Sequence, residues 1–385
     1  MSDWQKIVAQ IANNVEEHFD SLKLHLRQRL GIGPVHILPY LGHGTRQMLY
    51  LRGRAVADYD VVAAEDNDSI WDNLLNMYRR FNSHEIPFAR IQAHFGDHQA
   101  EVTANEEGFF EVRLALDTPI SSEQIWHEIE LELVEYDHQD SYQTTGRVIV
   151  PPDNAEFGVI SDLDDTVIQT DVLHWLRMAR NTFLHNSRTR LPFAGVAEFY
   201  RALQQGTQGS YNPIYYVSNS PWNLYDLMVD FFEVRGIPLG AMFLTDLGLT
   251  ADHLIREDPL KHKLNSIKTL LNTHPHMPFI LIGDSGEKDP EIYLRVVLDH
   301  PGRISAVYIR DVSETVRDQE IQSIVEQVRV AGSEMLLVPD TVAAAVHAAE
   351  HGFILPDTLP GIQQERTEDK KEPDTTEKLI DAITK

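Results

Sequence analysis

Short apolar runs that alternate with helical segments constrain the fold of this chain more than any other feature. The runs are Phe157–Leu163, Ile214–Val217, Ala241–Leu244, Phe279–Ile282, Ala306–Ile309 and Met335–Val338. Between them lie segments such as NLYDLMVDFFEVRG, in which apolar residues recur every three or four positions. Strands that alternate with helices form right-handed βαβ units around a parallel sheet. We therefore expect an α/β domain with a Rossmann-like parallel sheet over residues 151–355, with its ligand site beyond the carboxyl ends of the strands.

The residues before this domain predict two further structures. Residues 1–31 place apolar side chains at every third or fourth position and end in glycine, which favours an amphipathic helix that packs on the protein or binds a partner or membrane. Residues 32–150 contain short runs such as MLYLRGRAVA and HEIELELVEY between turns, which is typical of a β-sandwich-like domain. Within it, Asn105-Glu-Glu-Gly108 predicts a hairpin loop with Gly108 in the left-handed conformation.

Charge and composition exclude several classes of function. The 385 residues carry 59 acidic and 33 basic side chains, a formal net charge of −26, whereas a general nucleic-acid binder needs a basic surface. Cysteine is absent, which excludes disulfides, thiolate nucleophiles and Cys-ligated metals. Neither a secretory signal nor an apolar run that could span a bilayer is present, so we expect a cytoplasmic protein. Residues 356–385 are charged and lack aromatic residues, which predicts a disordered tail.

The first apolar run ends in SDLDDT, and this motif places two carboxylates at the end of a strand. Alternation puts Asp162 and Asp164 on the same side of an extended chain. Carboxylates this close repel each other unless a cation neutralises them or one takes a proton. Acids at loop starts also serve as turn caps, but the position at the end of a buried strand favours a site for Mg²⁺, a hard ion that prefers oxygen ligands.

Two more motifs supply groups that can bind a phosphate. Ser218 ends the run IYYV and can donate to a phosphate oxygen, whereas Ser220 before Pro221 is typical of a helix N-cap. Lys263 lies at the start of the helix before the next strand, where an ammonium can neutralise phosphate charge. Lys261 lies in the same turn and is the alternative to Lys263.

The last motif, GDSGEKD, follows the run Phe279–Ile282. Gly283 permits a close approach of the backbone, and Asp284 can complete a cage of oxygen ligands around Mg²⁺. Asp289 can support a ligand or accept a hydrogen bond from the lysine. Alone, this motif does not identify a function, but it follows the Asp pair, the Ser and the Lys along the chain.

Together the Asp pair, the Ser, the Lys and the Gly-Asp resemble the motifs of haloacid-dehalogenase-type phosphatases. The stretches SDLDDTVIQTDV, YVSNSPWNLYDL and LIGDSGEKDPEIY are more specifically similar to the catalytic domain of phosphatidate phosphatases of the actin-patch-associated type, distant relatives of the lipins. The resemblance covers roughly residues 146–338. The β-rich segment before it looks like the one that precedes this domain in bacterial members of the family.

This resemblance implies a mechanism and a set of roles. Asp162 would be the nucleophile that forms an aspartyl-phosphate, and Asp164 would be the general acid and then the general base. Mg²⁺ would be held by Asp162, Asp284 and Asp164, the last through its backbone carbonyl. Ser218 and Lys263 would bind phosphoryl oxygens in the transition state.

The segment between the first two motifs would select the substrate. Residues 168–195 predict a small basic cap, and its Arg177 and Arg180, with Thr166 and Asn219, are the candidate substrate-binding residues. In so acidic a chain, four arginines interleaved with apolar side chains are unusual, although the segment could also be an amphipathic helix packed on the sheet. We expect the bases to meet anionic headgroups at a membrane surface, each contributing about 1 kcal/mol.

Three functions are compatible with the sequence. The first is a magnesium-dependent phosphatidate phosphatase that releases diacylglycerol and phosphate, with peripheral membrane contact. The second is a phosphomonoesterase that acts on a soluble phosphorylated metabolite, and the third is a non-catalytic lipid-sensing module. The Asp162 and Asp164 pair argues against the third. The sequence alone leaves the oligomeric state, acyl-chain preference and role of the β-rich segment open.

Overall fold

A computed structural model describes most of the chain, namely residues 35–57, 84–134, 142–163, 195–245, 247–250, 253–256, 258–312 and 315–369. The chain forms two compact units. The first consists of Met1–Pro39, Leu51–Leu114 and Glu128–Gly146, and the second of Tyr40–Tyr50, Ala115–His127 and Arg147–Lys385. Residues 40–50 and 115–127 therefore pack in the second unit, although they precede the predicted boundary at residue 150. The predicted N-terminal helix and residues 168–194 of the predicted cap lie outside the described residues.

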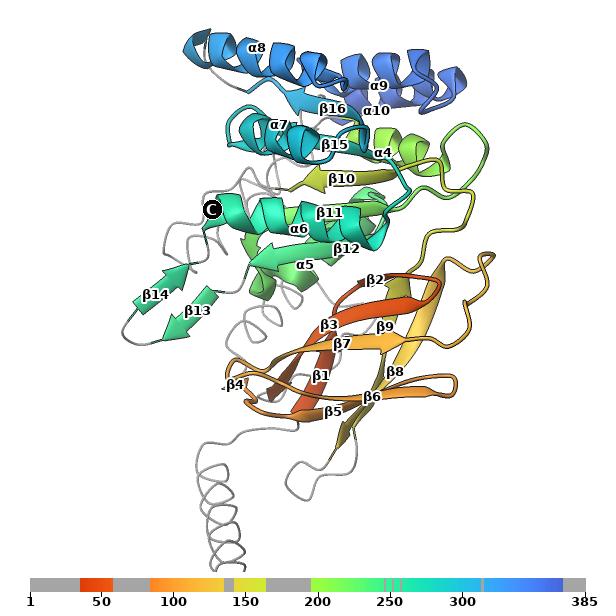
Figure 1. Ribbon diagram of the computed structural model, residues 1–385, viewed down its shortest axis with the longest axis vertical. Coiled ribbons are helices and arrows are strands. Elements are labelled where there is room, and N and C mark those ends of the chain that lie inside the picture. Colours follow the sequence, from red (N-terminus) through yellow and green to blue (C-terminus); the bar gives the residue numbers. More distant parts are fainter. Residues whose placement is uncertain are drawn as a thin grey trace, which may run out of the picture. The chain divides into compact units, whose positions relative to one another are not determined.

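The described part of the first unit consists of strands, most of them paired antiparallel (Figure 1). Their bounds are β1 (Val35–Pro39), β3 (Met48–Ala57), β4 (His84–Glu85), β5 (Arg90–Phe95), β6 (His98–Thr103), β7 (Phe109–Ala115), β8 (Trp126–Val134) and β9 (Gln143–Ile149), some extending into the second unit. In β8 every second side chain is buried, because one face of the strand packs on the core. Both quoted runs are confirmed as strands, β3 and β8. The sandwich arrangement stays a prediction.

The loop between β6 and β7 is partly as predicted. Gly108 has a φ of 79°, which confirms the left-handed conformation. The Asn105 side chain accepts hydrogen bonds from the backbone of Glu107 at 3.0 Å and Phe109 at 2.9 Å. The hairpin was wrong, however, because β6 pairs with β5 whereas β7 pairs with β3. The loop instead docks on β3, where Ala55 N donates to Gly108 O at 2.8 Å.

A six-stranded parallel sheet organises the second unit. Its strands, in spatial order, are β12 (Ala241–Thr245), β11 (Ile214–Pro221), β10 (Gly158–Asp162), β15 (Phe279–Asp284), β16 (Ile304–Arg310) and β17 (Met335–Val338). All neighbours are parallel, which confirms the predicted α/β sheet, although β11 and β15 extend beyond their predicted ends. The strand order reverses direction between β10 and β15. Ligands bind at such a switch point in open α/β sheets.

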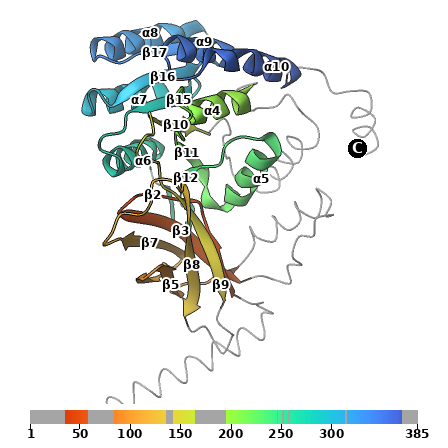
Figure 2. The same ribbon diagram turned by 90° about the vertical axis from the view of Figure 1, so that its right-hand side faces the viewer.

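Helices cover both faces of this sheet (Figure 2). Their bounds are α4 (Val196–Gln205), α5 (Tyr225–Arg235), α6 (Pro259–Thr273), α7 (Asp289–Asp299), α8 (Thr315–Val330), α9 (Thr341–Glu350) and α10 (Leu359–Asp369). α6 and α7 lie on one face, and α4 and α5 lie on the other. The core between the sheet and α6–α8 contains fully buried side chains from both layers, including Leu270, Leu281 and Val296. Burying these side chains is the main stabilising contribution to the unit.

Short elements complete the second unit. β2 (Gly42–Thr45) pairs with β3 and, in parallel, with β9. β13 (Leu247–Thr250) and β14 (His253–Arg256) form a separate antiparallel pair between β12 and α6. Two turns of 3₁₀ helix, η1 (Trp222–Leu224) and η2 (Pro356–Thr358), follow β11 and precede α10.

The predicted disordered tail was wrong for residues 356–369, which form η2 and α10. Ile362 is 1% exposed, and Arg366 forms an ion pair with Asp340 at the start of α9. Glu365 accepts a hydrogen bond from Glu198 N of α4 at 2.8 Å. The charged composition hid these contacts, because a single apolar anchor with two ion-pairing side chains is enough to dock a helix on a formed surface. Residues 370–385 lie outside the described part of the chain.

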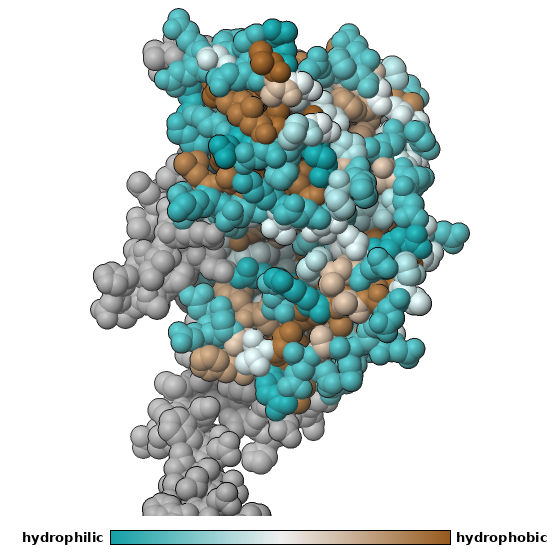
Figure 3. Space-filling model, viewed as in Figure 1, coloured by the Kyte–Doolittle hydropathy of each residue, from teal (hydrophilic) through white to brown (hydrophobic). Residues whose placement is uncertain are grey.

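The surface viewed in Figure 3 is mainly hydrophilic, with small brown areas between teal ones. The most exposed large apolar side chains among the described residues come from different elements, for example Val330 of α8 and Leu298 of α7. Isolated apolar side chains of this kind are normal on soluble proteins. None of the helices in the described residues combines the length and the apolar character that a membrane span requires.

Candidate active site

Asp162 is the last residue of β10, a strand whose side chains are all buried. Within the sheet, Asp162 lies level with Val217 of β11, and Ser161 lies level with Ile282 of β15. β10 therefore ends at the centre of the sheet, beside the end of β15. Asp162 itself is 6% exposed, so its carboxylate is held where few water molecules can screen it.

Lys263 of α6 provides the positive charge that Asp162 needs. Its Nζ lies 2.9 Å from Asp162 Oδ1, 2.8 Å from Glu287 Oε2 and 3.0 Å from Asp289 Oδ1. The Lys263 side chain is 3% exposed, so these charges interact with little screening. α6 is oriented for this contact by its N-cap, Asp258, which accepts a hydrogen bond from Leu260 N. Of the two lysines that the sequence left open, Lys261 is exposed, and only Lys263 reaches the carboxylates.

Asp284 ends β15 and is held by the loop that follows it. Its Oδ1 accepts hydrogen bonds from Gly286 N at 2.7 Å and Glu287 N at 3.0 Å. Burial raises the pKa of Asp284, and the neighbouring Asp289 carboxylate raises it further, whereas the two backbone hydrogen bonds and Lys263 oppose the shift. The negative charge of Asp284 is thus only partly stabilised by its surroundings, and an additional cation nearby would stabilise it further.

Asp289 joins α6 to the end of β15. Its Oδ1 accepts from Lys263, and its Oδ2 accepts from Asp284 N at 3.1 Å. The contact is possible because Gly283 has no side chain, since a Cβ there would lie 2.3 Å from Asp289 Oδ2. Asp289 therefore contacts both Lys263 and the end of β15.

Ser218 and Asn219 lie in an irregular part of β11. Val217 pairs with Phe243, but the next pair joins Pro221 to Thr245, so β11 bulges over residues 218–220. Bulges of this kind re-aim side chains next to functional sites. Ser218 is fully buried, and its Oγ accepts from Ser220 N at 2.9 Å. The prediction that Ser220 caps a helix was wrong, because the strand runs on to Pro221, which is itself the N-cap of η1.

Other predicted site residues lie outside the described part of the chain. These are Asp164, Thr166, Arg177 and Arg180. Conversely, the structure brings in Glu287, which sequence reasoning missed although it stands inside the quoted GDSGEKD motif. Its side chain is 35% exposed and contacts Lys263. Only the turn after β15 brings this residue back towards α6.

The site's donors suit a hard divalent cation. Carboxylate oxygens of Asp162, Glu287 and Asp289 lie within 4.8 Å of one another. This set differs from the predicted Asp162, Asp164 and Asp284, and in the structure Lys263 Nζ contacts all three of its members. The raised pKa of Asp284 and the purely oxygen character of the donors fit Mg²⁺, which prefers carboxylate ligands.

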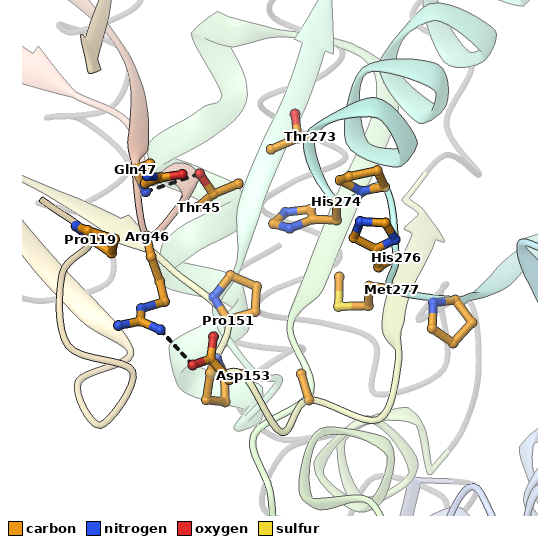
Figure 4. A pocket seen from close by; sticks show the side chains of 14 residues that line it. Thr45, Arg46, Gln47, Pro119, Pro151, Asp153, Thr273, His274, His276 and Met277 are labelled. Carbon is orange, nitrogen blue, oxygen red and sulfur yellow. Dashed lines mark hydrogen bonds and ion pairs between the residues drawn. The ribbon is translucent and has the colours of Figure 1, made fainter. Parts of the chain in front are cut away.

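A cavity of about 480 Å³ in the second unit lies away from these residues (Figure 4). Its wall includes Pro151, Asp153, His274 and Met277, which precede β10 and β15 in the sequence. Arg46 reaches Asp153 across it at 2.6 Å. The cavity therefore lies at the amino ends of the parallel strands, whereas Asp162 and Asp284 lie at the carboxyl ends.

Comparisons with known proteins identify the region that holds these residues. Residues 157–311 match the model of a family described as phosphatidate phosphatase APP1, catalytic domain. Phosphatidate phosphatase APP1 of Saccharomyces cerevisiae is 34% identical over 162 residues, which are 42% of this chain and 27% of that protein. An uncharacterized protein of Schizosaccharomyces pombe is 30% identical over 161 residues, which are 42% of this chain and 26% of that protein.

The resemblance to phosphatidate phosphatases of the actin-patch-associated type is thus confirmed for the region that contains the site. The chain spans about a quarter of the length of the curated relatives it matches. Among solved structures, a carbohydrate acetylesterase of Xanthomonas citri is 12% identical and aligns over 80% of this chain and 72% of its own, with a TM-score of 0.30. A likeness this low carries no argument.

Proposed function

We propose that this chain, whose residues 157–311 match the catalytic domain of the actin-patch-associated phosphatidate phosphatases, hydrolyses phosphatidate to diacylglycerol and phosphate by haloacid-dehalogenase-type chemistry. The observation that carries the proposal is the buried ion pair between Asp162 and Lys263 at the switch point of the parallel sheet. A carboxylate can act as a covalent nucleophile, and the ammonium of Lys263 favours its charged form, which supports this role for Asp162.

In the proposed first step, an Asp162 oxygen attacks phosphorus and a new O–P bond forms. The bond between phosphorus and the glycerol oxygen breaks, and that oxygen takes a proton from Asp164. Lys263 supports this step in two ways. Its charge favours the ionised, nucleophilic form of Asp162, and it offsets negative charge that accumulates on the phosphoryl oxygens.

In the second step, Asp164 removes a proton from a water molecule, which attacks phosphorus and breaks the bond to Asp162. Phosphate leaves and the Asp162 carboxylate is restored. We propose that Asp162, Asp284 and the Asp164 carbonyl hold Mg²⁺, which would orient the phosphate and reduce its repulsion from the anionic nucleophile. Ser218 and Asn219 are the proposed contacts to the phosphoryl oxygens, and their position in the bulge of β11, the strand that pairs with β10, supports this.

The basic segment after β10 would supply the preference for a lipid. We propose that Thr166 lies near the phosphate and that Arg177 and Arg180 meet the headgroup, while the chain works in the cytoplasm and contacts membranes peripherally. Neutralising Arg177, Arg180, Arg188 and Arg190 together should weaken binding to phosphatidate vesicles. Binding that is unchanged in this variant would contradict the membrane-contact part of the proposal and leave the chemistry of Asp162 intact.

The central experiment measures phosphate release from dispersed phosphatidate, with and without Mg²⁺. Asp162→Asn keeps the size of the side chain and removes the nucleophile, so we expect release to fall by at least about 10³-fold. Asp357→Asn, at an exposed position in η2, is the matched control and should keep full activity. Wild-type rates in Asp162→Asn would refute the mechanism.

A substrate panel separates the proposed function from its alternatives. Soluble phosphomonoesters, such as sugar phosphates and nucleotides, are compared with phosphatidate at equal concentration. A clear preference for phosphatidate is expected. Faster hydrolysis of a soluble ester would identify a phosphomonoesterase for metabolites, and vesicle binding without any hydrolysis would identify a lipid-sensing module.

A further inference from the structure

Three side chains that the proposed chemistry does not use gather at the amino ends of the parallel strands, opposite to Asp162. Glu334 immediately precedes β17, and His347 and His351 lie one turn apart at the C-terminal end of α9. His347 Nε2 lies 3.1 Å and His351 Nε2 3.3 Å from the same oxygen, Glu334 Oε2. One ligand atom from each residue lies within 4.8 Å of the others.

The hydrogen bond at the far side of the His351 ring determines what its Nε2 can do. His351 Nδ1 lies 2.9 Å from the backbone oxygen of His347. A carbonyl oxygen only accepts hydrogen bonds, so Nδ1 must carry a proton. In the neutral ring, Nε2 then presents a lone pair to the Glu334 carboxylate, which also carries lone pairs. Only a proton on Nε2 or a metal ion beside both atoms makes this arrangement favourable.

The Nδ1 of His347 also has a hydrogen-bond partner, a hydroxyl that can either donate or accept. This nitrogen lies 3.0 Å from the hydroxyl of Tyr308 on β16, and the His347 ring stacks on that of His351 with centroids 3.8 Å apart. One metal ion among the three ligand atoms would engage both Nε2 lone pairs and the Glu334 oxygen at once, without a charge on either ring.

We propose that Glu334, His347 and His351 form a binding site for a transition-metal ion such as Zn²⁺. Two histidines four residues apart on a helix and a carboxylate from another element are a common zinc ligand set, and three protein ligands leave a position for water. Hydrogen bonds from the opposite ring nitrogens to Tyr308 and to a backbone carbonyl are the usual outer support of such ligands.

The position of the site fits an ion that enters from solvent and stabilises the fold. The side chains of Glu334 and His351 are 55% and 41% exposed, and that of His347 is 13% exposed. The ion would join the C-terminal end of α9 to the start of β17. This place lies at the amino ends of the strands, whereas Asp162 lies at the carboxyl ends. The proposal is therefore independent of the proposed phosphatase activity.

The test is a calorimetric titration of the full chain with Zn²⁺ after treatment with a chelator, in excess Mg²⁺ to occupy hard oxygen sites. We expect one tight equivalent that is lost, or weakened at least about 100-fold, in His351→Gln and in the double variant His347→Gln/His351→Gln. His276→Gln, at an exposed histidine on the turn before β15, is the matched control and should bind as the wild type does.

Two further measurements make the result decisive. Co²⁺ in place of Zn²⁺ should give the visible absorption of a histidine-ligated ion in the wild type but not in the double variant. Zn²⁺ should raise the melting temperature of the wild type more than that of the double variant, whose own fold is checked by circular dichroism. Failure of the wild type to bind Zn²⁺ at micromolar concentration, or equal binding by the double variant, would overturn the proposal.

Discussion

The carboxyl ends and the amino ends of the parallel strands, called here the carboxyl edge and the amino edge of the sheet, carry different chemistry. At the carboxyl edge, Asp162 and Asp284 end their strands, and Lys263 neutralises a buried group of carboxylates. At the amino edge, three helices that precede or follow strands end in a histidine. These C-cap residues are His274 of α6, His300 of α7 and His351 of α9. One edge is therefore rich in oxygen donors and the other in imidazole nitrogens.

The direction of the βαβ units explains this difference. Each helix begins at the carboxyl edge, where its positive end favours acids, and ends at the amino edge, where its negative end favours bases. Asp258 and Asp340 are N-caps of α6 and α9, and Asp289 lies in the first turn of α7. The same fold thus gathers carboxylates at one end of the strands and imidazoles at the other, and only the carboxylates are buried around an internal cation, Lys263.

The largest expected effect comes from removing that internal cation. Lys263→Met keeps the length of the side chain but leaves Asp162 and the fully buried Asp289 without their ammonium. We expect the free energy of unfolding to fall by about 3–5 kcal/mol, because uncompensated buried charge is costly.

Chemical denaturation measures this loss, and Lys261→Met is the control. Lys261 lies in the same helical turn but is exposed, so its substitution should change stability by less than about 0.5 kcal/mol. Equal effects in the two variants would mean that the carboxyl edge does not depend on the buried ion pair.

Acid should destabilise the fold through two buried histidines. Burial lowers the pKa of His43 to about 3 and that of His274 to about 4, from 6.5. Both values lie below that of the unfolded chain, so the unfolded state binds more protons between pH 6.5 and the folded values, and stability falls as the pH falls. From pH 7 to pH 5 we expect a loss of about 2 kcal/mol for each histidine.

Denaturation at several pH values checks this, with His43→Phe as the informative variant. The His43 ring stacks on Tyr50 with centroids 5.0 Å apart, a contact that phenylalanine can keep. We expect the variant to lose about 2 kcal/mol of the pH dependence between pH 7 and pH 5. A pH dependence that stays the same would show that His43 does not titrate as its burial implies.

A smaller effect should follow from filling the space beside Asp289. In Gly283→Ala the new methyl group would meet Asp289 Oδ2 at 2.3 Å and push that side chain away from Lys263. We expect a loss of about 1–3 kcal/mol in stability and a lower rate of phosphate release. Gly361→Ala, where the methyl group meets nothing within 4 Å, should be neutral or stabilising by up to about 1 kcal/mol.

The smallest effect should distinguish the two edges most directly. Tyr308→Phe keeps the buried ring but removes the hydroxyl that contacts His347 Nδ1. We expect Zn²⁺ affinity to fall about 10-fold while Mg²⁺-dependent phosphate release stays as in the wild type. A fall in phosphate release with unchanged Zn²⁺ binding would contradict the assignment of this hydroxyl to the amino edge.

Local sequence signals were sufficient for the strands of the parallel sheet. Apolar runs predicted all six strands of the parallel sheet, and the acids after β10 and β15 indicated where those strands end. The errors arose where distant contacts decide the outcome. α10 packs on α4 and α9 with Ile362 buried. Phe109 begins a strand, β7, that pairs with β3 and not with its neighbour in sequence.

By itself, the sequence determined the alternation of strands and helices, the order of the phosphatase-like motifs and the family they resemble, because these depend on neighbouring residues. Only the tertiary structure decided that Lys263 and not Lys261 reaches Asp162, that Glu287 joins them, and that Glu334 meets two histidines from α9. The reason is physical: each of these contacts joins residues far apart in the chain, and which of them meet is set by strand order, helix rotation and burial together.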